Sequence, residues 1–259
     1  MLERGQDNLT VVLDNTSDAQ SYAKLLLKIA DNCTSNVPVQ QYVFTRVEEV
    51  MGTSEEQSNG ANNNATLFAT DNGHAQDGPF VRGLHSADAY CRQSASVGLA
   101  HLLSKLDGDD KTFCLWIVEQ LTAGSQSQSP SNARALEHAL AALIVLMRKH
   151  EARLVFLETG GVKLVTQVLA AIGPNGNAQH IYELCFVLWT FSLSRVTKCD
   201  DTGLALSTEE EVDFTVFLAA GTVPLLSELI SAAPSRKVVR MCLGCLRNLG
   251  KSSYVSLCL

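Results

Sequence analysis

The stretch "LETGGVKLVTQVL" (157–169) is followed later in the chain by a second version of itself, "LAAGTVPLLSELI" (218–230). The two stretches carry the same residue types at matching places: Leu157/Leu218, Gly160/Gly221, Val162/Val223 and Leu164/Leu225. In both, an apolar helical segment is followed by a glycine break and an amphipathic helix. This self-similarity predicts a repeat protein.

The segments around these stretches complete the repeat. The pattern of buried helix, short helix, glycine break and amphipathic helix occurs at 134–172, again at 179–232, and begins a third time at 235. A unit of roughly 40 residues with three helices is typical of armadillo and HEAT repeats. No stretch shows sustained alternation of period two, so no sheet is expected. The sequence therefore predicts an all-α, right-handed α-solenoid of the armadillo/HEAT type.

The glycines and leucines of the repeat have separate expected roles. The chain must turn sharply between two packed helices, so Gly160 and Gly221 are expected to adopt a positive φ. Leu164 and Leu225 follow the glycine breaks at equivalent places, and both are expected to be buried against the neighbouring repeat.

We expect one helical-repeat domain over residues 1–259 with two loop inserts. Residues 52–79 are rich in Asn, Gly and Ser and have few large apolar side chains, so they are not expected to join the core. The second insert is the acidic segment 197–211. Within it, Ser207 and Glu210 have the spacing of a capping box, which predicts that a helix begins there.

Composition excludes several classes of function. The formal net charge is −7 and no run of Lys or Arg is present, which argues against a nucleic-acid or anionic-membrane surface. The longest apolar runs, 138–147 and 184–194, are too short to cross a bilayer. Eight scattered cysteines without a secretory signal favour reduced thiols and a cytoplasmic location.

Two short motifs resemble nucleotide and zinc sites but fail on spacing. "LGKSS" (249–253) approaches a P-loop, yet Gly244 is one residue too far from Gly250 and the segment follows a helix. Gly250 is instead expected to end that helix. Cys242 and Cys245 form a lone CxxC without a second ligand pair, so two small core side chains are expected.

A third motif, "DGDD" (107–110), begins like a calcium loop, but Lys111 occupies a position that needs an oxygen ligand. A polar turn is expected there. No catalytic residue, cofactor or metal ligand is predicted.

The order of several segments resembles a known family, the H subunit of the vacuolar-type proton-pumping ATPase (V-ATPase). Residues 18–51 resemble its early "YAK" and "VQY" helices, and "GPFVRGL" resembles its Asp-Pro-Phe segment. "SASVGLAHLLSKL" and "FCLWIVEQL" resemble its next helix pair, and residues 154–253 resemble its armadillo-like core. The resemblance covers roughly 18–253 with gaps at 52–79 and 197–211. The family continues into a C-terminal domain that nothing in these 259 residues resembles, so the chain is expected to be a fragment, an isoform or a truncated form.

The resemblance implies a non-catalytic accessory subunit of the ATP-hydrolysing sector. It implies partners among the other pump subunits, namely the peripheral stalk and the proton-translocating sector, and no nucleic acid. Membrane association would come only through the complex, on the cytoplasmic face of vacuolar and other endomembranes. The family's C-terminal domain is credited with silencing the detached sector.

Nine residues are candidates for partner contacts. They are the helix-end cations together with one tryptophan and one asparagine: Arg148, Lys149, Arg153, Trp189, Arg236, Lys237, Arg240, Arg247 and Asn248. The cations could be solvated helix termini or contacts for acidic stalk helices. Trp189 could line a groove or pack in the core, and Asn248 could cap a helix or bond between repeats.

Two rival functions stay open. The first is a generic armadillo scaffold or a nuclear-import adaptor, although the adaptors' Trp–Asn pairs at a spacing of four are absent: Leu193 follows Trp189 and Gly244 precedes Asn248 at that spacing. The second is an enzyme, which would need a clustered polar pocket that the sequence does not offer.

Overall fold

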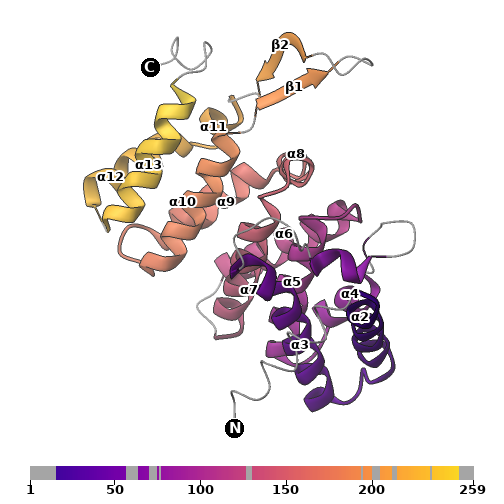
Figure 1. Cartoon of the computed structure of the whole chain (residues 1–259). Helices are drawn as coiled ribbons and strands as arrows, with labels where there is room; N and C mark the ends of the chain where they lie inside the picture. Colours follow the sequence, from indigo (N-terminus) through magenta and orange to yellow (C-terminus); the bar gives the residue numbers. More distant parts are fainter. Residues whose placement is uncertain are drawn as a thin grey trace. The chain divides into compact units, whose positions relative to one another are not determined.

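The computed structural model describes residues 16–56, 64–69, 75, 77–126, 130–193, 195–199, 205–211, 215–233 and 235–250. The chain divides into two compact units, Met1–Asp110 and Lys111–Leu259 (Figure 1). The single domain over 1–259 that the sequence suggests stays a prediction. Within the described residues the predicted fold class is confirmed, because helices form the architecture of both units and the fold is armadillo-like.

The N-terminal unit is a cluster of helices packed around phenylalanines. Its elements are α2 (Thr16–Asn32), α3 (Val37–Glu56), the 3-10 helix η1 (Asn64–Phe68), α4 (Gly78–Leu84) and α5 (Ala89–Leu103). Phe44 of α3 and Phe80 of α4 are fully buried, with ring centroids 6.1 Å apart. A Cβ at Gly83 would lie 2.5 Å from the Cβ of Ala95, so α4 can approach α5 this closely only with glycine there.

The first predicted insert differs from its prediction. The middle of 52–79 forms η1, which packs against α2, α3 and α5. Leu67 is 8% exposed and Phe68 is fully buried. The expectation that this segment stays out of the core is therefore wrong for 64–69. Two large apolar side chains are enough to anchor a short turn, even though the surrounding composition is polar.

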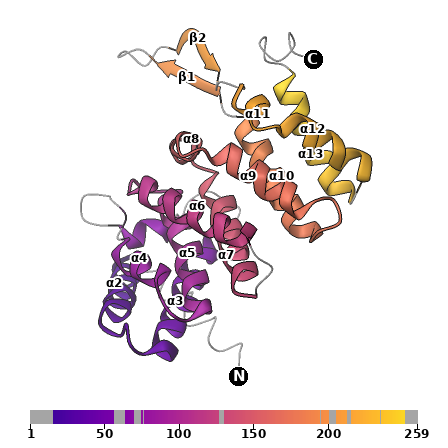
Figure 2. The ribbon, with the colours of Figure 1, turned by 180° about the vertical axis from the view of Figure 1, so that it is seen from behind.

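The C-terminal unit contains the repeats. Its elements are α6 (Asp110–Gln126), α7 (Pro130–Leu146), α8 (His150–Glu158), α9 (Gly161–Ile172), α10 (Ala178–Ser192), β1 (Arg195–Cys199), β2 (Ala205–Glu211), α11 (Thr215–Ala219), α12 (Thr222–Ala232) and α13 (Arg236–Leu249). Helices α7, α8 and α9 correspond to the first predicted repeat, α10, α11 and α12 correspond to the second, and α13 begins the third. In Figures 1 and 2, α10 and α13 lie side by side, and α12 lies against α13.

The glycine breaks have the predicted conformation. Gly160 has φ +79° and Gly221 has φ +73°, and each immediately precedes the helix of its repeat, α9 or α12. A Cβ at either glycine would meet nothing within 4 Å. The recurrence of glycine at this place in both repeats therefore follows from the left-handed backbone rather than from crowding.

The buried face of each repeat lies one residue beyond its predicted place. Leu164 and Leu225 are only half-buried, so the prediction that they are buried is wrong. Their neighbours Val165 and Leu226 are fully buried. Successive helical residues point about 100° apart, so a face assigned from leucines alone can be displaced by one position. The alignment of the two repeats is nevertheless in register.

The second insert contains a β-hairpin rather than a loop or a helix start. Strands β1 and β2 pair antiparallel, with Arg195 opposite Glu211 and Thr197 opposite Glu209. The capping box at Ser207 is therefore wrong, and α11 begins only at Thr215. A capping interaction contributes about 1 kcal/mol, which is too little to hold a helix where the periodic apolar residues have not yet begun.

Candidate partner-binding surface

The candidate cations after α7 include one that is structural. Arg153 donates through Nη1 to the carbonyl of Met147 at 2.8 Å and to that of Arg148 at 3.3 Å. Burial lowers the pKa of the Arg153 guanidinium, while the carboxylate of Glu151 opposes that change. Arg153 thus satisfies carbonyls at the end of α7. The side chain of Arg148 is exposed, and that of Lys149 is half-buried at the N-cap of α8.

Trp189 belongs to an aromatic stripe along α10. The ring centroids of Tyr182 and Phe186 are 6.4 Å apart, and those of Phe186 and Trp189 are 5.7 Å apart. All three side chains are half-buried. A Cβ at Gly244 would lie 3.0 Å from the indole Cδ1 and Nε1 of Trp189, so the indole packs on the backbone of α13. Trp189 therefore fills the junction between two repeats and keeps one part at the surface.

Asn248 forms a hydrogen bond between repeats. Its Nδ2 donates to Ser192 Oγ at 3.0 Å, joining α13 to α10. One of the two structural interpretations offered by the sequence, a bond between repeats, is therefore confirmed. The side-chain amide of Asn248 therefore helps to hold one repeat against the next.

The cations of α13 are exposed on a single helix face. Arg236, Arg240 and Arg247 have spacings of four and seven residues, which places them on one side of the helix, and Lys237 is also exposed. Leu243 shares this side and is 53% exposed. The face thus combines guanidinium groups with an apolar side chain, a composition common at protein interfaces.

The structure brings together some of the nine candidates. Trp189 and Asn248 both lie at the junction of α10 and α13, and the exposed cations are on α13. We call these residues of the two helices the α10–α13 surface. Arg148 and Lys149 lie in the turn between α7 and α8 instead, and Arg153 lies in the first turn of α8. No finding identifies any of the nine as a partner contact, so these assignments stay predictions.

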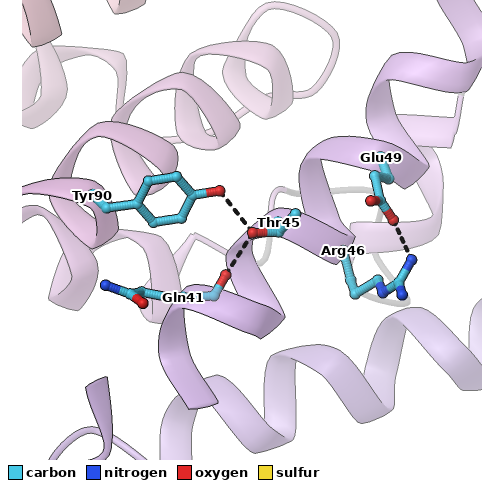
Figure 3. Close-up of polar contacts among 5 residues, drawn as sticks. All are labelled: Gln41, Thr45, Arg46, Glu49 and Tyr90. Carbon is cyan, nitrogen blue, oxygen red and sulfur yellow. Dashed lines mark hydrogen bonds and ion pairs between the residues drawn. The ribbon is translucent and has the colours of Figure 1, made fainter. Parts of the chain in front are cut away.

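A polar and aromatic cluster in the N-terminal unit was not predicted from the sequence (Figure 3). Thr45 Oγ1 lies 2.7 Å from Tyr90 Oη and donates to the carbonyl of Gln41 at 2.8 Å. Arg46 forms an ion pair with Glu49 at 2.5 Å. The signal that could have revealed it is the spacing of Gln41, Thr45 and Glu49 on α3.

Tyr90 is an exposed member of this cluster, and a second exposed tyrosine, Tyr42, lies beside Arg46. Tyr42 is 58% exposed, and the guanidinium carbon of Arg46 lies 5.2 Å from its ring centroid. Tyr90 is 41% exposed. Tyrosine and arginine are enriched at interfaces because each combines apolar area with a directed polar group. The cluster is therefore a second place on the chain that suits a protein contact.

The motifs resembling ligand sites have structural roles. Gly250 directly follows α13, and its N–H bonds to carbonyls of that helix, which confirms the predicted helix end. Asp107 accepts a hydrogen bond from the N–H of Ala75 at 2.9 Å, within the predicted polar turn. In the described parts of the chain, no group of three or more His, Cys, Asp or Glu side chains is arranged to hold a metal ion.

The described helices are short or polar by the standard of membrane spans. Among the residues that the structure places, no single helix is long and apolar enough to cross a bilayer. One pair, α8 with α9, reaches that length and composition only jointly, across a bend of 77°.

Comparison with known proteins identifies the family. The family model for the H subunit of the V-ATPase matches residues 6–200, which is more than half of the chain. The chain belongs to the V-ATPase H-subunit family. The resemblance found in the sequence is therefore confirmed, and with it the armadillo-like helical fold.

Curated relatives extend the match beyond residue 200. The H subunit of the V-type proton ATPase of Dictyostelium discoideum is 26% identical over 96% of this chain and 54% of its own length. The probable H subunit of the V-type proton ATPase of Oryza sativa subsp. japonica is 21% identical over 90% of this chain and 50% of its own length. The chain thus spans about half the length of the curated relatives it matches.

A solved structure of an engineered protein is also similar. The match covers 92% of this chain at 15% identity, with a TM-score of 0.45.

Proposed function

We propose that the chain is a non-catalytic accessory subunit of the peripheral, ATP-hydrolysing sector of the vacuolar proton pump. It binds the peripheral stalk and supports ATP-driven proton transport. The observation that carries the proposal is the family match over residues 6–200. The exposed side chains of successive helical repeats support a binding role, because solenoid proteins bind their partners through such surfaces.

The proposed location follows from the complex. A subunit bound to the peripheral sector lies at the cytoplasmic face of acidified endomembranes and reaches the membrane only through other subunits. Contacts extend to the peripheral stalk and to the proton-translocating sector, and no nucleic acid is involved. The formal net charge of −7 is consistent with this, because it disfavours direct binding to phosphate groups.

The α10–α13 surface is the proposed stalk contact on the C-terminal unit. Arg240 and Arg247 provide positive charge, and Leu243 provides an exposed apolar side chain between them. A stalk segment that suits this face carries carboxylates around an apolar residue. Charge complementarity of this kind raises association rates and is weakened by salt.

A reconstitution experiment tests the proposal. Purified chain is added to pump sectors that lack the H subunit, and binding and ATPase rate are followed together. We expect binding without silencing of the detached sector. Inhibition as complete as that given by a full-length member of the family would place the regulatory role within these 259 residues. Absence of binding would return the chain to the class of generic armadillo scaffolds.

A charge-reversal pair sharpens the test. Arg240→Glu with Arg247→Glu should weaken binding to the sectors. Lys163→Glu is the control, because Lys163 is also exposed but lies on α9. If both variants bind like the unaltered chain, the stalk contact lies elsewhere. The polar and aromatic cluster of the N-terminal unit, which contains Arg46, is then the next surface to alter.

A further inference from the structure

Two buried cysteines of successive repeats face each other. Cys185 of α10 and Cys242 of α13 are both fully buried, and their Sγ atoms lie 3.7 Å apart. Cys245, the other thiol of the CxxC sequence, points elsewhere: its Sγ lies 3.8 Å from the carbonyl oxygen of Leu188. The sulfur partner of Cys242 is therefore across the repeat junction, on a helix that is distant in sequence.

The environment differentiates the two thiols. The hydrogen bond between them and burial raise the pKa of Cys185, and the same hydrogen bond lowers the pKa of Cys242. Burial raises the pKa of the Cys245 thiol to about 12. Since the thiolate is the reactive form of cysteine, the direction of these shifts favours Cys242 as the attacking thiol, and Cys185 lies within 3.7 Å of it.

Disulfide formation requires the two sulfur atoms to move closer together. A disulfide has a sulfur–sulfur bond of about 2.05 Å, so the two sulfurs must approach by roughly 1.7 Å. Helices α10 and α13 pack against each other, so the two side chains are already held on facing helices.

We propose that Cys185 and Cys242 are a redox modification site that forms a reversible disulfide between the two repeats. The oxidant is of the peroxide class. The Cys242 thiolate attacks one peroxide oxygen, so that an S–O bond forms, the O–O bond breaks and hydroxide leaves to become water. The Cys185 sulfur then attacks the sulfenic sulfur of Cys242. The S–S bond forms, the S–O bond breaks, and the oxygen leaves as water with the Cys185 proton.

The overall reaction conserves atoms and electrons, and it is reversible. Two thiols lose two electrons and two hydrogen atoms in total, and one hydrogen peroxide is reduced to two water molecules. A dithiol reductant restores both thiols by exchange.

Burial sets the rate of this reaction rather than preventing it. Reagent reaches Cys242 only when α13 opens from α10 and α12, the helices it packs against. In repeat proteins such local opening involves nearest-neighbour interfaces and precedes global unfolding. Oxidation should therefore accelerate in mild denaturant, well below the concentration that unfolds the chain.

The disulfide would fix the junction that carries the α10–α13 surface. It would join residues separated by 57 positions, which limits the freedom of the unfolded chain. We expect a rise of several degrees in melting temperature on oxidation, reversed by dithiothreitol. The inference does not rest on the role in the proton pump, because it concerns only this pair of helices.

Peptide mapping of the whole chain tests the proposal. The chain is treated with a small excess of hydrogen peroxide, remaining thiols are alkylated, and the digest is analysed without reduction. The expected result is a linked peptide pair containing Cys185 and Cys242, with the loss of two hydrogen atoms. The link should persist in Cys245→Ser and in Cys33→Ser, and it should be absent in Cys242→Ser.

Three outcomes would overturn the proposal. One is a link between Cys242 and Cys245, and another is a link between two chains. The third is oxidation of Cys242 to sulfinic acid, or no loss of its thiol, in mild denaturant without any linked pair. Because the linked peptides are read in the unaltered chain, the result does not depend on whether a variant folds.

Discussion

Thr166 and Thr222 are joined by a hydrogen bond of 2.8 Å between their hydroxyl oxygens, across the junction of α9 and α12. Both side chains are buried. Thr166 donates its single hydroxyl hydrogen to the carbonyl of Val162 at 2.8 Å, so Thr222 is the donor in the bond between repeats. Together with the bond from Asn248 to Ser192, this contact fixes how one repeat is placed on the next.

The direction of this hydrogen bond predicts unequal effects of substitution. Thr222→Val removes the donor and leaves Thr166 bonded to Val162, so it should cost about 1 kcal/mol of unfolding free energy. Thr166→Val leaves the buried Thr222 hydroxyl without its acceptor and should cost about 1–3 kcal/mol. Urea titration measures both values. Equal costs, or a larger cost for Thr222→Val, would contradict the assigned direction.

Adjacent leucines of α12 provide a matched test of the repeat core. Leu226 is fully buried and Leu225 is only half-buried. Leu226→Ala should therefore cost about 2–5 kcal/mol, and Leu225→Ala clearly less. Thermal or urea unfolding of the two variants measures the loss of unfolding free energy in each. The reverse order would mean that the buried face is the one first assigned from the sequence.

The close approach of α4 and α5 depends on one glycine. A Cβ at Gly83 would lie 2.5 Å from Ala95 Cβ and 2.8 Å from the Phe44 ring, so Gly83→Ala should destabilise the N-terminal unit by about 1–3 kcal/mol. Gly78 begins the same helix, and a Cβ there would lie 3.6 Å from its nearest neighbour, a flexible arginine side chain. Gly78→Ala should thus be close to neutral. A neutral Gly83→Ala in a differential scanning experiment would contradict the packing.

The N-cap of α5 predicts a pH dependence. Asp88 accepts from the N–H of Cys91 at 2.9 Å and from Gln41 Nε2 at 3.2 Å, and these bonds lower the pKa of its carboxyl. A lowered folded-state pKa contributes stability above the unfolded value of about 3.9, and this contribution is lost as the pH falls through the folded value. The stability advantage over Asp88→Asn should therefore shrink below about pH 4. An advantage that is constant from pH 7 to pH 3 would contradict the role of the carboxylate.

Local and repeated features of the fold could be predicted from the sequence. The glycine breaks at Gly160 and Gly221, the burial of α7 and the end of α13 all depend on residues close together in the chain. The sequence also showed the order of segments on which the family resemblance rests. These features can be predicted without knowledge of distant contacts, because helix propensity and hydrophobic periodicity act within one or two helical turns.

Features that depend on distant partners could not be predicted. The burial of Phe68 requires α2, α3 and α5 to surround η1. The hairpin in the second insert depends on backbone pairing between Arg195 and Glu211, which no periodicity indicated. The contact of Cys185 with Cys242 likewise requires the register of two repeats. Among the candidate cations, only the structure shows that Arg153 is engaged in capping α7.

The central claim is that this chain binds the peripheral stalk of the vacuolar proton pump, and equilibrium binding to the isolated stalk subunits tests it most directly. Biolayer interferometry with immobilised stalk and the purified chain would measure the dissociation constant at low and at physiological salt. A stable contact buries on the order of 1,000 Å² or more, so we predict saturable binding that weakens as salt rises. Binding no stronger than that to an unrelated helical protein, at either salt concentration, would contradict the account.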